Sequence, residues 1–242
     1  MYSENNYEYR PQGFNILPAA CKHLLIINVI IFLFCGVLKL RGIYIEDLFG
    51  LHYFQSSKFH FYQLITYAFL HGSFSHLFFN MFAIWMFGAA LENMWGSKRF
   101  LIYCFAAALG AALMQEITYW FMYHDIAEGV YSGVKVMRNG ISAVVPPEAF
   151  LGQINTVGAS GICFGLLLAF GIMFPNNYIY LYFLLPIKVK YFVAGYMILE
   201  LLNGIAATND GVAHFAHLGG ALAGLLLFVY WKKKNRNDYE IY

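Results

Sequence analysis

The stretch V-G-A-S-G-I-C-F-G, residues 157–165, places one hydroxyl among three glycines inside an apolar run from Ile154 to Phe174. A run of this length matches a helix that crosses the roughly 30 Å hydrocarbon core of a bilayer, which takes about 20 residues. Across the chain, 60% of the 242 residues are hydrophobic and 12% are charged, whereas an average soluble domain is about 25% charged. The composition therefore predicts an integral membrane protein.

Six apolar runs are long enough to be membrane-spanning helices. They cover residues 20–40, 63–91, 98–123, 153–174, 178–202 and 211–231. The second run exceeds a simple span, so we expect its start at Gln63 to be interfacial or tilted. Pro186, Lys188 and Lys190 interrupt the fifth run, so its membrane part is expected to begin near Tyr191. The predicted fold class is an all-α membrane protein, a six-transmembrane-helix bundle.

Lys and Arg are distributed unequally between the segments that connect these runs. If the N-terminus is cytoplasmic, that side receives ten of them and the other side four, and cytoplasmic loops normally carry the excess. We therefore expect a multi-pass protein of the plasma (inner) membrane with both termini cytoplasmic. It would consist of a cytoplasmic segment 1–19, a six-span core 20–231 and a basic cytoplasmic tail 232–242. The N-terminal segment shows no signal-peptide features, so the first apolar helix is expected to drive insertion.

Composition also argues against several function classes. The net charge of +2 is small and evenly spread, and no basic stripe alternates with aromatics, so no nucleic-acid partner is predicted. The four cysteines lie in or beside apolar runs without C-x-x-C pairing, which is typical of small buried residues. No internal repeat is visible, whereas a transporter would favour repeated halves.

Four polar side chains are predicted to lie in one layer below the external surface. Ser160 is about seven residues into the fourth run and His217 about six into the sixth, so each lies about 10 Å deep at 1.5 Å per residue. His76 and Asn80 on the second run are at i and i+4 and face the same way. Because these three runs share one direction, a hydroxyl, an imidazole and an amide are expected at similar depth.

These residue types suit acyl transfer. A Ser hydroxyl is a weak nucleophile unless a base takes its proton, and His, with an ordinary pKa of about 6.5, is the usual partner. Ser160 is therefore the expected nucleophile and His217 the expected base, while His76, Asn80 and the Ser160 backbone N–H are expected to bind the oxyanion. The acidic residues Glu92, Glu116 and Glu200 are expected to lie deep or toward the cytoplasmic ends. The sequence therefore predicts a Ser–His dyad in which packing orients His217.

Each of these features also has a structural interpretation. An isolated Ser in a membrane helix usually bonds its own i−4 carbonyl, and closely spaced glycines are typical of helix packing. His71 and His214 remain candidates for structural hydrogen bonding. The competing chemistry is a metal site, since H-x-x-H stands at 214–217, but the sequence has no H-E-x-x-H and no carboxylate is expected near that layer. We therefore expect no metal and no cofactor.

Three motifs resemble those of the rhomboid family of intramembrane serine proteases. G-A-S-G at 158–161 is similar to the family's G-x-S-G, H-L-F-F-N at 76–80 to its H-x-x-x-N, and A-H-L-G-G-A-L-A-G at 216–224 to its A-H-x-x-G-x-x-x-G. They stand in the family's order, on the second, fourth and sixth runs. The resemblance implies that Ser160 is the nucleophile and His217 the base, with His76 and Asn80 at the oxyanion.

The resemblance also assigns roles near the site. Phe164 matches an aromatic position that packs on the catalytic imidazole, the G-x-x-x-G at 220–224 would pack on the fourth helix, and His214 does not match the catalytic motif. Tyr62-Gln63 stand where many members carry Trp-Arg. Because Gln offers fewer hydrogen bonds than Arg and no charge, the first external loop is expected to be held less rigidly.

The predicted function is that of an intramembrane serine endopeptidase, which hydrolyses a peptide bond in or near a transmembrane segment of another membrane protein. The implied partners are single-span or other transmembrane substrates and the lipid bilayer. Two alternatives are a catalytically silent rhomboid-like binder and a transporter that uses its histidines as a polar relay. Inactive relatives typically lack the Ser or the His, whereas this chain has both.

Overall fold

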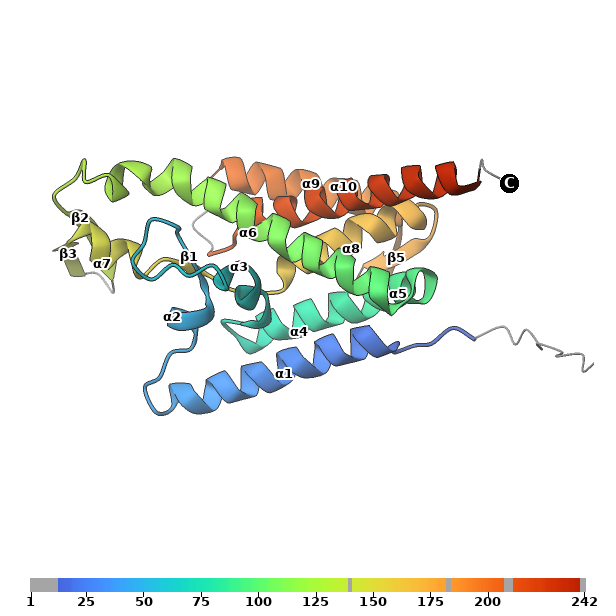
Figure 1. Cartoon of the computed structure of the whole chain (residues 1–242), viewed down its shortest axis with the longest axis horizontal. Coiled ribbons are helices and arrows are strands. Elements are labelled where there is room, and N and C mark those ends of the chain that lie inside the picture. The colour runs from blue at the N-terminus through green and yellow to red at the C-terminus, as the bar shows by residue number, and fades with distance from the viewer. Residues whose placement is uncertain (1–12, 139–140, 182–183, 207–210, 240–242) are drawn as a thin grey trace, which may run out of the picture.

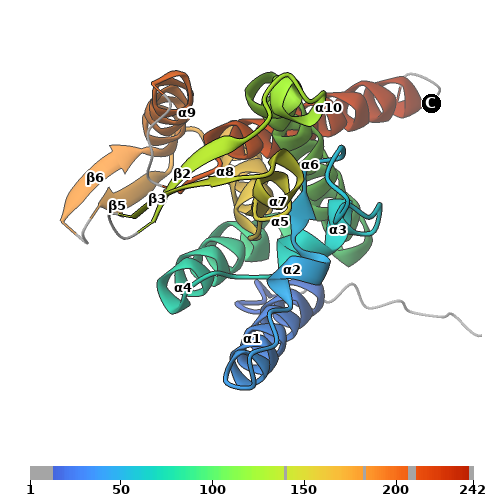
Figure 2. The same cartoon turned by 90° about the vertical axis from the view of Figure 1, so that its left-hand side faces the viewer.

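The computed structural model describes residues 13–138, 141–181, 184–206 and 211–239. Within these ranges the chain is mostly helical, and its long helices run roughly alongside one another (Figure 1). They are α1 (Ala19–Lys39), α4 (Phe74–Ala83) continued through η2 (Ile84–Gly88) into α5 (Ala89–Trp95), α6 (Ser97–Ala127), α8 (Ser160–Met173), α9 (Val189–Ile205) and α10 (His214–Tyr239). The view along the bundle places α1 beside α4, at the opposite side from α9 and α10 (Figure 2).

Four of the described helices are long and apolar enough to cross a membrane. They are Ala19–Lys39, Phe74–Trp95, Ser97–Ala127 and His214–Lys234. Helix α8 is apolar but has only 14 residues, and α9 has 17, whereas a simple span takes about 20. The chain is therefore an integral membrane protein with a helical core, and the count of six spans stays a prediction.

The second predicted run, 63–91, is not one continuous helix. Helix α3 (Gln63–Thr66) and the short η1 (Tyr67–Phe69) form a separate segment, and α4 starts only at Phe74. Between them the backbone of Leu70 is extended, and the Ser73 hydroxyl accepts a hydrogen bond from the His76 backbone N–H at 3.2 Å. This N-cap fixes where the helix begins.

The fourth run also starts its helix later than predicted. Residues Asn155–Thr156 form β4, which pairs antiparallel with β1 (Leu51–His52). Gly158 follows with φ of +132°, a left-handed value that favours glycine. Ser160 is therefore the first residue of α8, and the expectation that it lies about seven residues into its helix is wrong.

Short strands make the all-α prediction incomplete. Besides β1 and β4, the described residues form two antiparallel pairs, β2 (Val134–Arg138) with β3 (Ile141–Val145) and β5 (Tyr178–Leu181) with β6 (Leu185–Lys188). The second of these pairs occupies the first part of the predicted fifth span, and α9 begins at Val189, close to the expected Tyr191.

The connections gather at the two ends of the bundle. Helix α2 (Glu46–Phe49), β1, α7 (Pro147–Leu151) and the β2–β3 hairpin lie at one end, while the start of α1 and the end of α10 lie at the other (Figure 1). The predicted terminal segments, 1–19 and 232–242, fall partly outside the described residues.

Glycines bring α10 close to both α6 and α8. A Cβ added at Gly220 would overlap the backbone carbonyl of Gly161 on α8, so the two helices meet through main-chain atoms. A Cβ at Gly224 would instead overlap the ring of Tyr103 on α6. The expected packing of the 220–224 motif on the fourth helix is therefore confirmed for its first glycine, while the nearest neighbour of its second glycine is on α6.

Candidate active site

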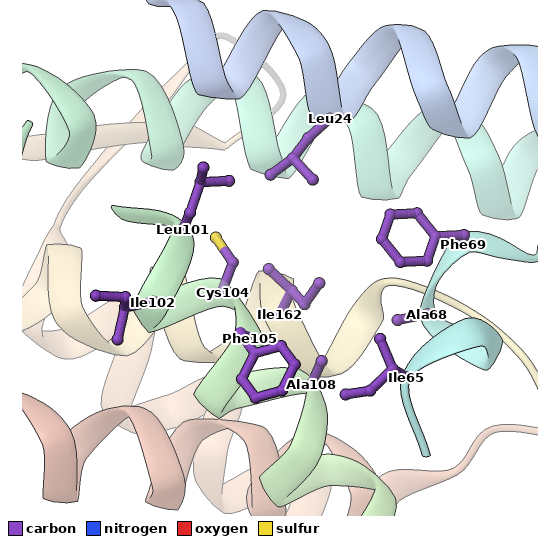
Figure 3. A pocket seen from close by; sticks show the side chains of 10 residues that line it. All are labelled: Leu24, Ile65, Ala68, Phe69, Leu101, Ile102, Cys104, Phe105, Ala108 and Ile162. Atoms are coloured by element: carbon purple, nitrogen blue, oxygen red, sulfur yellow. The ribbon is translucent and has the colours of Figure 1, made fainter. Parts of the chain in front are cut away.

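Two of the cavities among the described residues differ in their chemistry. One, of about 390 Å³, opens between α1, α6 and the α3–η1 segment (Figure 3). Cys104 is the only ionisable residue in its lining of Leu24, Ile65, Ala68, Phe69, Leu101, Ile102, Cys104, Phe105, Ala108 and Ile162. This cavity therefore lacks the groups that acid–base chemistry needs.

The other cavity, of about 860 Å³, lies where α4, α8, α9 and α10 meet the segment 155–158. Its lining contains all four side chains that the sequence singled out, together with a carboxylate and a further imidazole: His76, Asn80, Ser160, His217, Glu200 and His214. The structure thus brings the predicted site residues together, and their catalytic roles stay predictions.

Ser160 and His217 are in direct contact. Ser160 Oγ lies 2.8 Å from His217 Nε2, the distance of an ordinary hydrogen bond. The contact joins the first residue of α8 to the fourth residue of α10, next to the close approach of Gly161 and Gly220. A hydroxyl that donates to an imidazole nitrogen is the arrangement in which the imidazole can take its proton.

Phe164 holds the imidazole from one face. Its ring stacks on His217 with centroids 4.3 Å apart and an angle of 8° between the planes, as the resemblance implied. The Tyr196 ring of α9 lies next to Phe164, with centroids 5.0 Å apart. The plane of the imidazole is therefore set by an aromatic side chain one turn beyond Ser160.

The prediction that no acidic residue reaches this layer is wrong. Glu200 Oε2 lies 2.8 Å from His217 Nδ1 and 2.9 Å from His214 Nδ1, and all three residues are buried. The error has a topological cause, because α9 runs in the opposite direction to α10. A residue near the end of α9 therefore lies level with residues near the start of α10.

Glu200, His214 and His217 are also the described residues that could hold a metal ion, since their ligand atoms lie within 4.8 Å of one another. The reason given above against a metal, the lack of a nearby carboxylate, does not hold. The Nδ1 to Oε2 distances of 2.8 and 2.9 Å fit N–H···O hydrogen bonds. Ligand atoms of a tetrahedral zinc at 2.0–2.1 Å would stand about 3.3 Å apart, so the spacing favours hydrogen bonding.

His76 and Asn80 form the opposite wall of the cavity. Gly158 passes so close to the His76 ring that a Cβ added there would lie 2.6 Å from two ring atoms. The Asn80 Oδ1 accepts from Cys163 Sγ at 3.6 Å, while its buried Nδ2 has no hydrogen-bond partner among the described residues. This wall therefore presents an open amide donor near the N-terminus of α8, where backbone N–H groups lack helical partners.

The segment 48–63, which the sequence assigns to the first external loop, is held together by the side chain of Gln63. The buried Gln63 side chain accepts from the backbone N–H groups of His52 and His60, and it donates to the carbonyls of Leu48 and Lys58. These four bonds use both donors and both acceptor positions of the amide. A neutral Gln therefore bonds to four backbone groups of this loop, and the expectation that the loop is held less rigidly than with Arg stays a prediction.

A family model described as the Rhomboid domain matches residues 58–234, a range that contains every residue of the site. The chain belongs to the rhomboid family. This rhomboid is 31% identical over 177 residues to Rhomboid protein 1, mitochondrial, of Saccharomyces cerevisiae, a match that covers 70% of this chain and 42% of that protein. It is 26% identical over 213 residues to RHOMBOID-like protein 12, mitochondrial, of Arabidopsis thaliana, covering 87% and 57%.

Rhomboid protease GlpG of Serratia proteamaculans is 26% identical to this rhomboid over 176 residues, covering 73% of this chain and 50% of that protein. The chain thus spans about half the length of these curated relatives. The family membership supports an intramembrane protease at the level of the family. Because relatives include mitochondrial proteins, the prediction of a plasma membrane is not established, whereas integral membrane localisation is supported.

Proposed function

We propose that this rhomboid is an active intramembrane serine endopeptidase, which hydrolyses a peptide bond in or near a transmembrane segment of another membrane protein. The observation that carries the proposal is the 2.8 Å contact between Ser160 Oγ and His217 Nε2 inside the 860 Å³ cavity. Relatives named as rhomboid proteases support the reaction class.

In this proposal His217 takes the Ser160 proton as the hydroxyl oxygen attacks the substrate carbonyl carbon. The resulting oxyanion is stabilised by donors from His76, the Asn80 Nδ2 and the Ser160 backbone N–H. His217 then passes its proton to the leaving amine, and a water molecule, activated by the same imidazole, releases the acyl group. The reaction needs no cofactor.

The substrate of such a site must lose its helical structure locally. A helix hides each peptide bond in its own hydrogen bonding, so the carbonyl can reach Ser160 only after unwinding. We therefore expect small or helix-weakening residues near the cleaved bond. Single-span and other transmembrane proteins in the same bilayer are the proposed partners.

We further propose six spans with both termini cytoplasmic, on the strength of the Lys and Arg distribution. A reporter fused at Tyr242 should then behave as cytoplasmic, and one inserted near Gly133 as external. The opposite pattern would place the Ser160–His217 pair nearer the cytoplasmic surface and overturn this topology.

A fluorophosphonate probe tests the proposed activity directly, because it labels an activated serine covalently. The purified wild type in detergent should be labelled and should cleave members of a panel of single-span proteins. Ser160→Ala should lose both properties, while Ser75→Ala, which changes another hydroxyl of the same cavity, should keep them. A silent binder would instead retain single-span proteins without any labelling or cleavage.

A further inference from the structure

The proposed Ser–His dyad gives no role to the carboxylate of Glu200. A single oxygen, Oε2, lies within hydrogen-bond distance of Nδ1 of both His217 and His214. The three side chains are buried, and a buried carboxylate is costly unless it is paired and hydrogen-bonded. We infer that Glu200 is a positioning residue, the third member of a Ser160–His217–Glu200 array that His214 anchors. This inference rests on the proposed function and deepens it.

The first argument concerns the tautomer of His217. A neutral imidazole has one N–H and one lone pair, and the partner of one nitrogen decides where the proton sits. An anionic oxygen 2.8 Å from Nδ1 holds the proton on that nitrogen. The lone pair is then on Nε2, which faces the Ser160 hydroxyl. Glu200 thus selects the form of His217 that can act as a base.

The second argument concerns charge. When His217 takes the Ser160 proton it becomes an imidazolium, and a carboxylate at hydrogen-bond distance stabilises that cation. The charge therefore develops beside an anion that is already in place, which is the arrangement that lowers the cost of proton transfer in a buried site.

The third argument concerns orientation. Phe164 fixes the plane of the imidazole by stacking, but stacking alone leaves the ring free to turn within that plane. Contacts at both nitrogens, Glu200 at Nδ1 and Ser160 at Nε2, remove that freedom. Packing and hydrogen bonding are thus both needed to aim the ring.

His214 supports Glu200 from the same helix as His217. It lies three residues earlier, one turn away on a similar face, and its Nδ1 donates to the same oxygen. Among the described residues, the other titratable groups around this array are His76 on α4, Tyr67 on η1, Tyr196 on α9 and Cys163 on α8. Among the described residues, the two histidines of α10 contact the carboxylate, at 2.9 and 2.8 Å.

The test compares Glu200→Gln with Glu116→Gln. The first keeps the size of the side chain and removes its charge; the second makes the same change at another buried glutamate, which accepts a hydrogen bond from the Phe54 backbone N–H. Glu200→Gln should lower kcat by at least about 10²-fold, the lower end of a general-base contribution, with little change in KM. The acid limb of its pH profile should move to lower pH, because the imidazolium has lost its anionic partner. Glu116→Gln should move neither.

A second readout does not depend on activity. In wild type with ¹⁵N-labelled histidine, NMR should show His217 protonated at Nδ1, and Glu200→Ala should abolish that preference in a variant that still unfolds cooperatively. Normal kcat and an unchanged acid limb in Glu200→Gln, with Ser160→Ala inactive, would overturn the inference and leave the proposed function intact. An unlabelled, inactive wild type would remove the proposed function, and an Nε2-protonated His217 would overturn the inference in either case.

Discussion

The two walls of the 860 Å³ cavity differ in how completely their polar groups are paired. On the α8–α9–α10 wall, Ser160, His217 and Glu200 form a continuous chain of hydrogen bonds. On the α4 wall, the Asn80 Nδ2 is buried without a partner among the described residues. A buried donor without a partner is costly, so the difference suggests that one wall is complete before a substrate arrives and the other is completed by the substrate.

Removing Ser160 or His217 from the paired wall should have the largest effect. Ser160→Ala and His217→Ala should each lower cleavage on the order of 10⁶-fold, and the double variant should add little, because residues that act as a unit are strongly non-additive. Initial rates on a single-span substrate measure this. Substantial activity in either single variant would separate the two residues and break the comparison.

On the open wall we expect a smaller loss. Asn80→Ala should lower kcat about 10²–10³-fold, the effect of losing one oxyanion donor. The fluorophosphonate probe should still label Ser160 in this variant. Asn93→Ala is the matched control, since that amide on α5 donates to the carbonyls of Asn15 and Ala89. If both variants keep full kcat, the Asn80 amide has no part in the reaction. The substrate then does not complete the hydrogen bonding of the α4 wall.

His214 lies on the paired wall but touches the carboxylate and not the hydroxyl. His214→Ala should lower kcat about tenfold, the effect of one hydrogen bond to a charged group, and chelators should leave the wild type active. A loss as large as that of His217→Ala would reassign the base. Inhibition by chelators that added zinc reverses would revive a metal bound by Glu200, His214 and His217.

The smallest effect on catalysis is expected outside the cavity, at Gln63. Gln63→Ala removes four hydrogen bonds within the segment 48–63 and should destabilise the protein by about 2–3 kcal/mol, because buried backbone groups lose their partners. Thermal unfolding in detergent measures this, with the exposed Gln153→Ala as control. A large loss of kcat without a change in stability would instead tie the loop to the reaction.

Hydropathy alone located the helices that are continuous along their whole length. The runs 20–40 and 98–123 match α1 and α6 within a few residues. The runs 63–91 and 153–174 failed at their first residues, which form short separate elements and loops ahead of α4 and α8. Apolar residues in such segments have the same composition as those in a long helix. The N-cap at Ser73 and the left-handed backbone of Gly158 are the local features that mark where α4 and α8 begin.

The motifs placed Ser160, His217, His76 and Asn80 in one cavity, yet Glu200 was missed. Its signal was present, since an ionisable residue within a membrane run is a functional candidate by default. The position of its partner depends on the direction of α9 and on how α9 packs on α10. Spacing along the sequence carries that information only once the direction of every helix is taken into account.

The contact between Gly161 and Gly220 bears on how the Ser160–His217 separation responds to the surrounding lipid. Where two helices touch through main-chain atoms, no side-chain rotamer lies between them. The separation of the Ser160 and His217 backbones is then a property of the two helix axes. Lipids or substrates that displace neighbouring side chains leave that separation unchanged, so the alignment of hydroxyl and imidazole should persist across bilayers of different composition.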